Sequence, residues 1–356
     1  MGNNVWLSAY GPHNWGYTAQ ITPEQPELVI PRGKATGGSS AVNGQVLFRG
    51  IPEDYDRWAE WGNDEWSFVN VLPYFNKLET DLDFGGGDFH GSDGPVPVRR
   101  MPRSEWLPHA QAFEQACVAE GYPIDEDQNH PESTGVSPRA RNTIDGVRMS
   151  MAINYLDIAR HRLNLTIRAN VTARPDSIRR QKGLSTVRPK WRSTTILNYI
   201  GMSASLQLAL GQGELTLQST DPHVQPFLNY NYYQEEEDLR RMREAIRMCV
   251  RLADHPSFSS IVMERVMPTD EELSSDEELN AWLRRNSGTS HHISGTCKMG
   301  PDSDPMAVVD QHLKVKGIQG LRVADASVMP DCIRANTNAT TIMIGEKVAD
   351  YIKDGR

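Results

Sequence analysis

The stretch His292-Ile293-Ser294-Gly295-Thr296-Cys297-Lys298-Met299-Gly300 decides how this chain is interpreted, together with Asn336-Thr337-Asn338-Ala339-Thr340-Thr341 near the C-terminus. The first offers a histidine followed by a Gly-Thr turn, and the second offers asparagine before an apolar, helix-like run. Oxidation of an alcohol carbon needs a base that takes the hydroxyl proton and a neutral donor that holds the oxygen. His292 and Asn338 are the candidates for these roles. A lone histidine is more often structural, however, and Asn336 or Asn338 could simply cap a helix over residues 340–352.

Two further stretches suggest a flat, phosphate-bearing ligand. Residues 31–44 contain a Gly-Gly-Ser-Ser run, which allows the backbone to approach such a ligand closely, although such a run is often only a flexible loop. Residues 320–327 read as a strand that ends at Asp325 and Ala326. An acidic residue followed by small side chains suits a ribose or pyrophosphate contact, and the plain alternative is a strand followed by a turn.

In their order and spacing these motifs resemble the glucose-methanol-choline (GMC) family of FAD-dependent oxidoreductases. The resemblance covers residues 15–173 and 191–352 and is nearest to the branch of bacterial alcohol and choline dehydrogenases and aryl-alcohol or hydroxymethylfurfural oxidases. Two further segments match that branch: the glycine turn and acidic-aromatic helix of residues 49–56, and Leu72-Pro73-Tyr74-Phe75.

The resemblance implies an α/β (α+β) fold of two lobes, one binding FAD and one carrying an antiparallel sheet with flanking helices. Residues 1–94 would contact the flavin, 95–173 and 191–286 would form the substrate lobe around a junction at 174–190, and 287–356 would return to the FAD lobe. His292 would be the proton acceptor and Asn338 the donor to the substrate oxygen, with His291 as a wall or support. FAD would be held without a covalent histidyl link, since Ala41 and Val42 stand in the loop where some members carry that histidine. The implied cofactor contacts are Arg32, Gly37, Gly38, Ser39, Asn43, Gly44, Asp325, Ala326, Asn336 and Thr340.

The chain differs from the family in two respects, and these differences leave another function open. No G-x-G-x-x-G turn for the ADP part of FAD occurs in the chain, and near Arg174 the sequence passes directly into the second half of the substrate lobe. The fold is therefore expected to be incomplete relative to the family. An FAD-free lyase or a non-catalytic binding protein on a shortened scaffold is the alternative to alcohol oxidation.

The composition of the chain limits the classes of partner that we expect. A net charge of -9 argues against nucleic acid, because phosphate binding needs a basic face. The 4 cysteines are scattered without a C-x-x-C pair, which favours a reduced, cytoplasmic protein, and Cys297 is expected to pack rather than react. No apolar run reaches membrane-spanning length. The expected partners are a small alcohol and an electron acceptor, either oxygen or a quinone.

Periodicity predicts the local structure. Helices are expected over residues 52–62, 66–79, 107–120, 150–156, 236–252, 271–285 and 340–352, with a short helix over 41–48. Strands are expected over 96–98, 163–167, 196–200, 204–210, 214–217 and 320–325, and residues 1–30 are expected to be extended loop. Phe227, Tyr230, Tyr232 and Tyr233 could line a substrate pocket, but the core is the favoured place for them.

Overall fold

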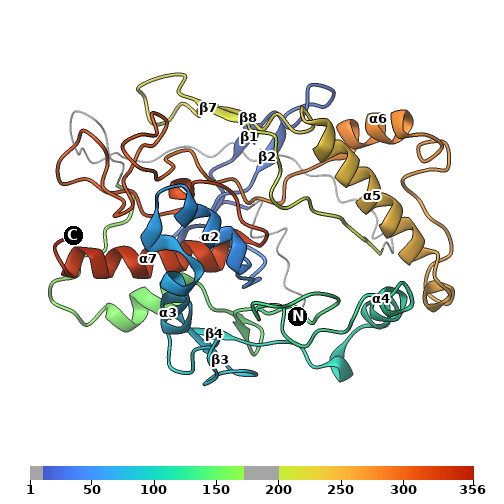
Figure 1. The fold of residues 1–356 in the computed structure, drawn as a ribbon, viewed down its shortest axis with the longest axis horizontal. Helices are drawn as coiled ribbons and strands as arrows, with labels where there is room; N and C mark the ends of the chain where they lie inside the picture. Colours follow the sequence, from blue (N-terminus) through green and yellow to red (C-terminus); the bar gives the residue numbers. More distant parts are fainter. Residues whose placement is uncertain (1–10, 172–199) are drawn as a thin grey trace.

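The computed structural model describes residues 11–171 and 200–356 (Figure 1). The described chain mixes helices with small two-stranded sheets, in agreement with the predicted mixed α/β class. The predicted junction over residues 174–190 and most of the predicted strand over 196–200 lie outside the described residues.

Three helices build the main core. They are α2 (Pro52–Glu60), α3 (Phe68–Leu78) and α7 (Thr337–Lys353), which pack together with the turn η2 (Asp64–Trp66) in Figure 1. Helix α2 starts with proline at its first position and two acidic residues in its first turn, which suits the positive end of a helix dipole. Its Tyr55 and Trp58 are fully buried against Trp66 and Phe75.

A β-hairpin near the N-terminus replaces the predicted extended loop. Strands β1 (Tyr17–Ala19) and β2 (Leu28–Ile30) pair antiparallel, with Tyr17 opposite Ile30. A second antiparallel pair, β7 (Glu214–Thr216) and β8 (Phe227–Asn229), joins the hairpin through a bridge between Gln20 and Asn229. The segments are short and far apart in sequence, and their pairing is therefore a tertiary contact that local periodicity does not reveal.

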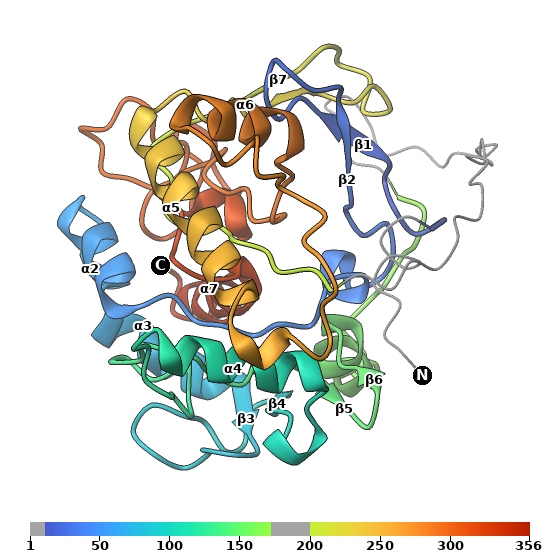
Figure 2. The same ribbon diagram turned by 90° about the vertical axis from the view of Figure 1, so that its right-hand side faces the viewer.

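Three more helices lie beside this sheet and core (Figure 2). Helix α5 (Glu236–Ala253) contacts both α4 (Pro108–Ala119) and α6 (Asp276–Asn286). The sequence predicted all three, but α6 begins five residues later than expected because the Ser275 side chain accepts from the Glu278 amide and caps it there.

Smaller elements complete the described chain. Strands β3 (Glu79–Asp81) and β4 (Val96–Val98) pair in parallel, and β5 (Thr143–Ile144) and β6 (Val147–Arg148) form a hairpin. The single turns are η1 (Gly38–Ala41), η3 (Arg103–Glu105), η5 (Pro256–Phe258) and η6 (Ala326–Val328), and η4 (Ala152–Asp157) is a π-helical segment. No described helix combines the length and apolar character needed to cross a bilayer.

Several local predictions were wrong. Residues 163–167, 204–210 and 320–325 form no strand, because alternation alone supplies no neighbouring edge to pair with; Arg322 makes only an isolated bridge to Lys314. The helix expected over 41–48 is reduced to the turn η1. Helix α7 begins three residues earlier than predicted, so Asn338 and Thr340 lie inside it.

Candidate functional site

Backbone pairing fixes the histidine motif to the turn at residues 326–328. The amides of Gly295, Cys297 and Met299 donate in sequence to the carbonyls of Ala326, Ser327 and Val328, at 3.3, 2.8 and 2.8 Å. Met299 and Val328 are buried in the main core. The segment that follows His292 is thus anchored, and His292 stands at its start, facing the first residues of α7.

His292 is held between two neighbouring residues at the start of α7. The Asn336 Nδ2 lies 2.7 Å from its Nε2, and the Thr337 Oγ1 lies 3.2 Å from its Nδ1. Because an amide nitrogen can only donate, Nε2 acts as the acceptor in the contact with Asn336, and Nδ1 faces both the hydroxyl and, at 3.5 Å, the backbone amide of Thr337. The basic lone pair of Nε2 therefore lies beside an amide donor.

The structure places Asn336, rather than the predicted Asn338, against His292. Asn336 is the residue that precedes the first turn of α7, yet its side chain forms no cap bond. Capping, the plain alternative for this asparagine, therefore does not account for its side chain. Asn338 lies two residues further along, within the first turn of α7, where its Nδ2 is buried and has no hydrogen-bond partner among the described residues. Choosing between two asparagines two residues apart requires knowing where the helix starts, which the sequence misplaced.

Burial and nearby charge keep His292 neutral. Desolvation, followed by the adjacent His291 and the Arg32 guanidinium, lowers the pKa of His292 to about 4. A neutral imidazole is the form that can accept a proton, so this environment suits a general base at ordinary pH.

The predicted flavin loop forms a tight turn with one open face. Gly37 and Gly38 have φ of 91° and 56°, in the region that favours glycine, and a Cβ at Gly38 would meet nothing within 4 Å. The remaining residues hold the loop's own shape. Ser39 Oγ accepts from the Gly33 amide, Asn43 Oδ1 accepts from Gln45, and the Gly44 carbonyl accepts from Arg141.

Of the other predicted cofactor contacts, some lie at an exposed turn and one lies in the core. Asp325 is exposed and caps η6, with its carboxylate accepting from the Ser327 amide and hydroxyl at 2.8 and 2.5 Å, and Ala326 begins that turn. Thr340 is wrongly predicted as a cofactor contact: it is fully buried, and its hydroxyl is bonded to the Tyr55 hydroxyl at 2.8 Å. The helix turns this residue to the core, because it lies on the same face as Ile344 and Val348.

A flavin fits what the described residues offer. The orphaned Asn338 amide is a buried donor without an acceptor, and a polar heteroaromatic ring can supply one. The open space at Gly38 leaves the loop backbone free to approach a flat ring.

The tyrosines after β8 belong partly to the core and partly to the site. Tyr230 packs with the hairpin residues, and Tyr233 packs with α5 and α6, as the favoured prediction had it. Tyr230 and Tyr232, however, also interact electrostatically with Arg32, which in turn lowers the pKa of His292. Sequence reasoning missed this association, since the residues come from distant segments.

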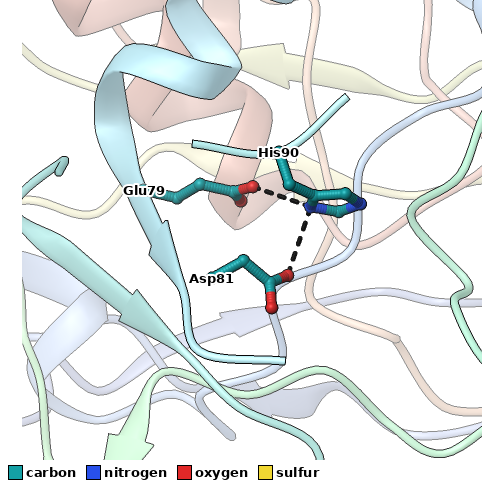
Figure 3. A group of neighbouring side chains, drawn as sticks. All are labelled: Glu79, Asp81 and His90. Atoms are coloured by element: carbon teal, nitrogen blue, oxygen red, sulfur yellow. Dashed lines mark hydrogen bonds and ion pairs between the residues drawn. The ribbon is translucent and has the colours of Figure 1, made fainter. Parts of the chain in front are cut away.

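A second polar cluster lies buried between β3 and the loop that follows it (Figure 3). His90 Nδ1 lies 2.9 Å from Glu79 Oε1 and 3.2 Å from Asp81 Oδ2, and these three residues are close enough to hold a metal ion. The far ring nitrogen, Nε2, lies 2.7 Å from Asp127 Oδ2.

Two arginines show that this cluster is an ion-pair network. Arg49 pairs with Glu79 at 2.5 Å, and Arg100 pairs with Asp81 and Asp127 at 2.9 and 2.6 Å. With both ring nitrogens facing carboxylates, His90 is an imidazolium, and these acceptors raise its pKa to about 10 against the desolvation that opposes it. Three cations then face four carboxylates, because Arg100 also lies 3.4 Å from Asp83, and a divalent ion bound by Nδ1 would have to displace the Nδ1 proton and add charge beside two guanidinium groups. We therefore interpret the cluster as structural.

Comparison with known proteins places these observations in context. Family models described as GMC oxidoreductase match residues 14–195 and 209–345. The oxygen-dependent choline dehydrogenase of Klebsiella pneumoniae subsp. pneumoniae is 30% identical over 96% of this chain and 85% of its own length. The corresponding enzyme of Sinorhizobium medicae is 28% identical over 98% of this chain and 87% of its own. The alignment to the Klebsiella enzyme spans 478 positions, more than this chain contains, so it includes residues without a counterpart here.

Solved structures share the fold at lower identity. Pyridoxine 4-oxidase from Mesorbium loti superposes with a TM-score of 0.81 and 20% identity, covering 99% of this chain and 92% of that one. A formate oxidase of Aspergillus oryzae gives 0.79 and 19%, with 99% and 90% covered. A fungal aryl-alcohol oxidase gives 0.74 and 16%, with 97% and 90% covered.

Proposed function

Because this chain belongs to the GMC oxidoreductase family, and is an FAD-dependent alcohol oxidoreductase, we propose that His292 and Asn336 act together on the hydroxyl group of its substrate. The observation that carries this proposal is the 2.7 Å separation between the Asn336 amide nitrogen and the basic Nε2 of His292. An alcohol oxygen that accepted from the Asn336 amide in place of Nε2 would leave Nε2 free to take the hydroxyl proton.

Each residue has a distinct task. The alcohol gives its hydroxyl proton to Nε2 of His292, while the Asn336 amide donates to the same oxygen and stabilises the negative charge that develops on it. Thr337, whose hydroxyl and backbone amide lie 3.2 and 3.5 Å from Nδ1, holds the orientation of the ring. The first turn of α7 directs its positive end toward the same place. Asn336 thus takes the role that the sequence assigned to Asn338.

FAD supplies the acceptor for the hydride that leaves the alcohol carbon. The Asn338 amide and the backbone around Gly38 would hold the flavin ring, since they offer an orphaned donor and an open approach. Ser39, Asn43 and Gly44 would keep the loop in shape, and Asp325 and Ala326 would lie toward the ribose and phosphate part. The substrate is a small alcohol. Molecular oxygen is preferred to a quinone as the electron acceptor, because the similar choline dehydrogenases are oxygen-dependent and the similar solved structures include oxidases.

We also place the protein in the cytoplasm. All 4 cysteines are free and scattered, as expected in a reducing compartment. Fractionation of the source cells would test this, and recovery in an oxidising compartment would contradict it.

The experiment is a visible absorption spectrum of the purified protein, before and after adding FAD. We expect a flavin band that bleaches when alcohol is added without oxygen. His292→Ala should keep the band and slow the bleaching by about 100-fold or more, whereas the exposed His109→Ala should match the parent. Absence of a flavin band after FAD addition would overturn the redox function and favour the lyase or binding alternative.

A further inference from the structure

The segment that enters α7 is held by a buried carboxylate of α2. Asp54 Oδ2 accepts from the Arg334 backbone amide at 2.8 Å, and Asp54 Oδ1 accepts from Arg334 Nε at 2.9 Å. The Asp54 side chain is fully buried, whereas that of Arg334 is 35% exposed. Both oxygens of this carboxylate therefore contact one residue, which precedes Asn336 by two positions.

Tyr55, the next residue of α2, holds the same helix further along its first turn. Its hydroxyl lies 2.8 Å from Thr340 Oγ1 and accepts from the Gly50 amide at 3.0 Å. Burial raises the pKa of Tyr55, so the hydroxyl keeps its proton and can donate it to Thr340. A Cβ at Gly50 would lie 2.8 Å from the Tyr55 hydroxyl and 3.0 Å from Asp54 Oδ2, so glycine leaves both groups room to reach α7.

Arg57 of α2 holds the beginning of the same segment. Its Nε lies 3.4 Å from Asp331 Oδ2, and its Nη2 donates to the Cys332 carbonyl at 3.2 Å. Residues 331–336 form neither helix nor strand, so no ladder of backbone hydrogen bonds fixes their course. The burial of Ile333 and Ala335 keeps the segment in the core, and its polar contacts with α2 set its position.

The contact that the proposed function needs lies between these attachments. Asn336 follows Arg334 by two residues, which span at most about 7 Å of extended chain. A shift of Arg334 is therefore passed to Asn336, whose Nδ2 lies 2.7 Å from Nε2 of His292. A displacement of about 1 Å at a reacting group can cost about 100-fold in rate.

We propose that Asp54 is a positioning residue for alcohol oxidation, which sets the distance between Asn336 and His292 by holding Arg334. This inference rests on the proposed function of Asn336 and His292. The plain alternative is a buried ion pair that only stabilises the fold. A stabilising contact changes the free energy of unfolding, whereas a positioning contact also changes the surroundings of His292 in the folded protein.

The first readout is the protonation of His292, which needs no substrate. NMR of protein labelled with nitrogen-15 histidine, with FAD added and the signal assigned by His292→Gln, follows the ring nitrogens between pH 5 and 8. In the parent the ring should stay neutral throughout, because burial and the charges of His291 and Arg32 lower its pKa to about 4. A donor on Nε2 also favours the neutral ring. Asp54→Asn should therefore raise the midpoint by about one pH unit or more, and Asn336→Ala should raise it at least as far.

Turnover of benzyl alcohol gives the second readout. Asp54→Asn should lower kcat by about tenfold and change KM by less than about twofold, because the contact that it loosens acts in the transition state. Since Asp54 acts through Asn336, the two losses should not multiply: adding Asp54→Asn to Asn336→Ala should lower kcat by less than about twofold more. The matched control is Asp56→Asn. Asp56 also lies on α2, but its carboxylate accepts from the Phe68 amide at 2.8 Å, away from the segment, and both readouts should stay at the parent values.

Arg334→Gln keeps the inference testable if Asp54→Asn does not fold, because the Arg334 side chain is partly exposed. It removes one of the two contacts with Asp54 and should move the midpoint of His292 in the same direction by a smaller amount. An unchanged midpoint in the folded variants would overturn the inference and leave Asp54 a structural role, and so would losses of kcat that multiply in the double variant. If the parent bleaches with no alcohol, the proposed function fails, and the titration of His292 still decides whether Asp54 places Asn336.

Discussion

Replacing His90 by glutamine should remove the central cation of the buried network and change how stability depends on pH. The network leaves His90 6% exposed between carboxylates that both arginines also contact. Since one pKa unit corresponds to about 1.4 kcal/mol, a rise from 6.5 to about 10 represents a preference of about 4 to 5 kcal/mol for the charged ring. This value agrees with the cost of breaking a buried ion pair in other proteins, which is about 3 to 5 kcal/mol. We expect His90→Gln to lower the free energy of unfolding by about 3 to 5 kcal/mol at pH 6.

The sign of the pH dependence follows from the raised pKa. In the folded state His90 keeps its proton up to about pH 10, whereas in the unfolded chain it loses it near 6.5. Its contribution is complete below 6.5 and is lost as pH rises toward 10, by up to about 1.4 kcal/mol per pH unit. The difference between the parent and His90→Gln should therefore shrink steadily across this window.

Urea unfolding followed by tryptophan fluorescence, at pH 6, 8 and 9.5, measures this difference. The exposed His109→Gln should stay within about 0.5 kcal/mol of the parent at every pH. A constant gap between the parent and His90→Gln from pH 6 to 9.5 would refute the reasoning, because a neutral His90 would then be the native form.

Three further outcomes are expected. The limb of the pH profile of kcat/KM that reports protonation of His292 should fall near pH 4 rather than near 6.5. Arg32→Gln should move this limb to higher pH, because it removes a positive charge that lowers the pKa of His292. A limb at 6.5 in the parent would contradict the burial of this ring. Asn336→Ala should lower kcat by about 100-fold with FAD retained, whereas Asn338→Ala should mainly weaken FAD retention, measured by the flavin absorbance that survives gel filtration; the reverse pattern would return the catalytic role to Asn338. Lys347→Met should raise the melting temperature at pH 7, because Lys347 is 4% exposed and burial lowers its pKa to about 8. A lower melting temperature would show that the attraction between the lysine and the surrounding aromatic rings outweighs the cost of its desolvation.

The sequence predicted the helices well because their signals are local. Helices α2, α4 and α5 lie within two residues of their expected bounds at each end, and each has either a proline start or acidic residues in its first turn. The hairpin β1–β2 and the failed strand at 320–325 depend on partners elsewhere in the chain, and alternation carries no information about them.

The sequence predicted which residues belong to the candidate site better than it predicted how they are placed relative to one another. His292 followed from the motif, but its partner depended on where α7 starts: a start at Thr337 places Asn336 at the helix end and Thr340 in the core.

His90 and Lys347 make the free energy of unfolding depend on pH in opposite directions, and the two effects should cancel in the parent. Above pH 8 the folded state has released the Lys347 proton while the unfolded chain keeps it to about 10.5, so this lysine makes stability rise with pH. Over the same range His90 makes stability fall. The two slopes are equal in size and opposite in sign between about pH 8 and 10, and the parent should show little net change from these groups. His90→Gln should then become more stable from pH 8 to 10, Lys347→Met should become less stable, and the double variant should return to the flat behaviour of the parent. Because the lysine lies among Trp66, Tyr74 and Tyr351 and the histidine among carboxylates of another cluster, the two effects should add; a double variant that keeps either slope would show that the two clusters are coupled.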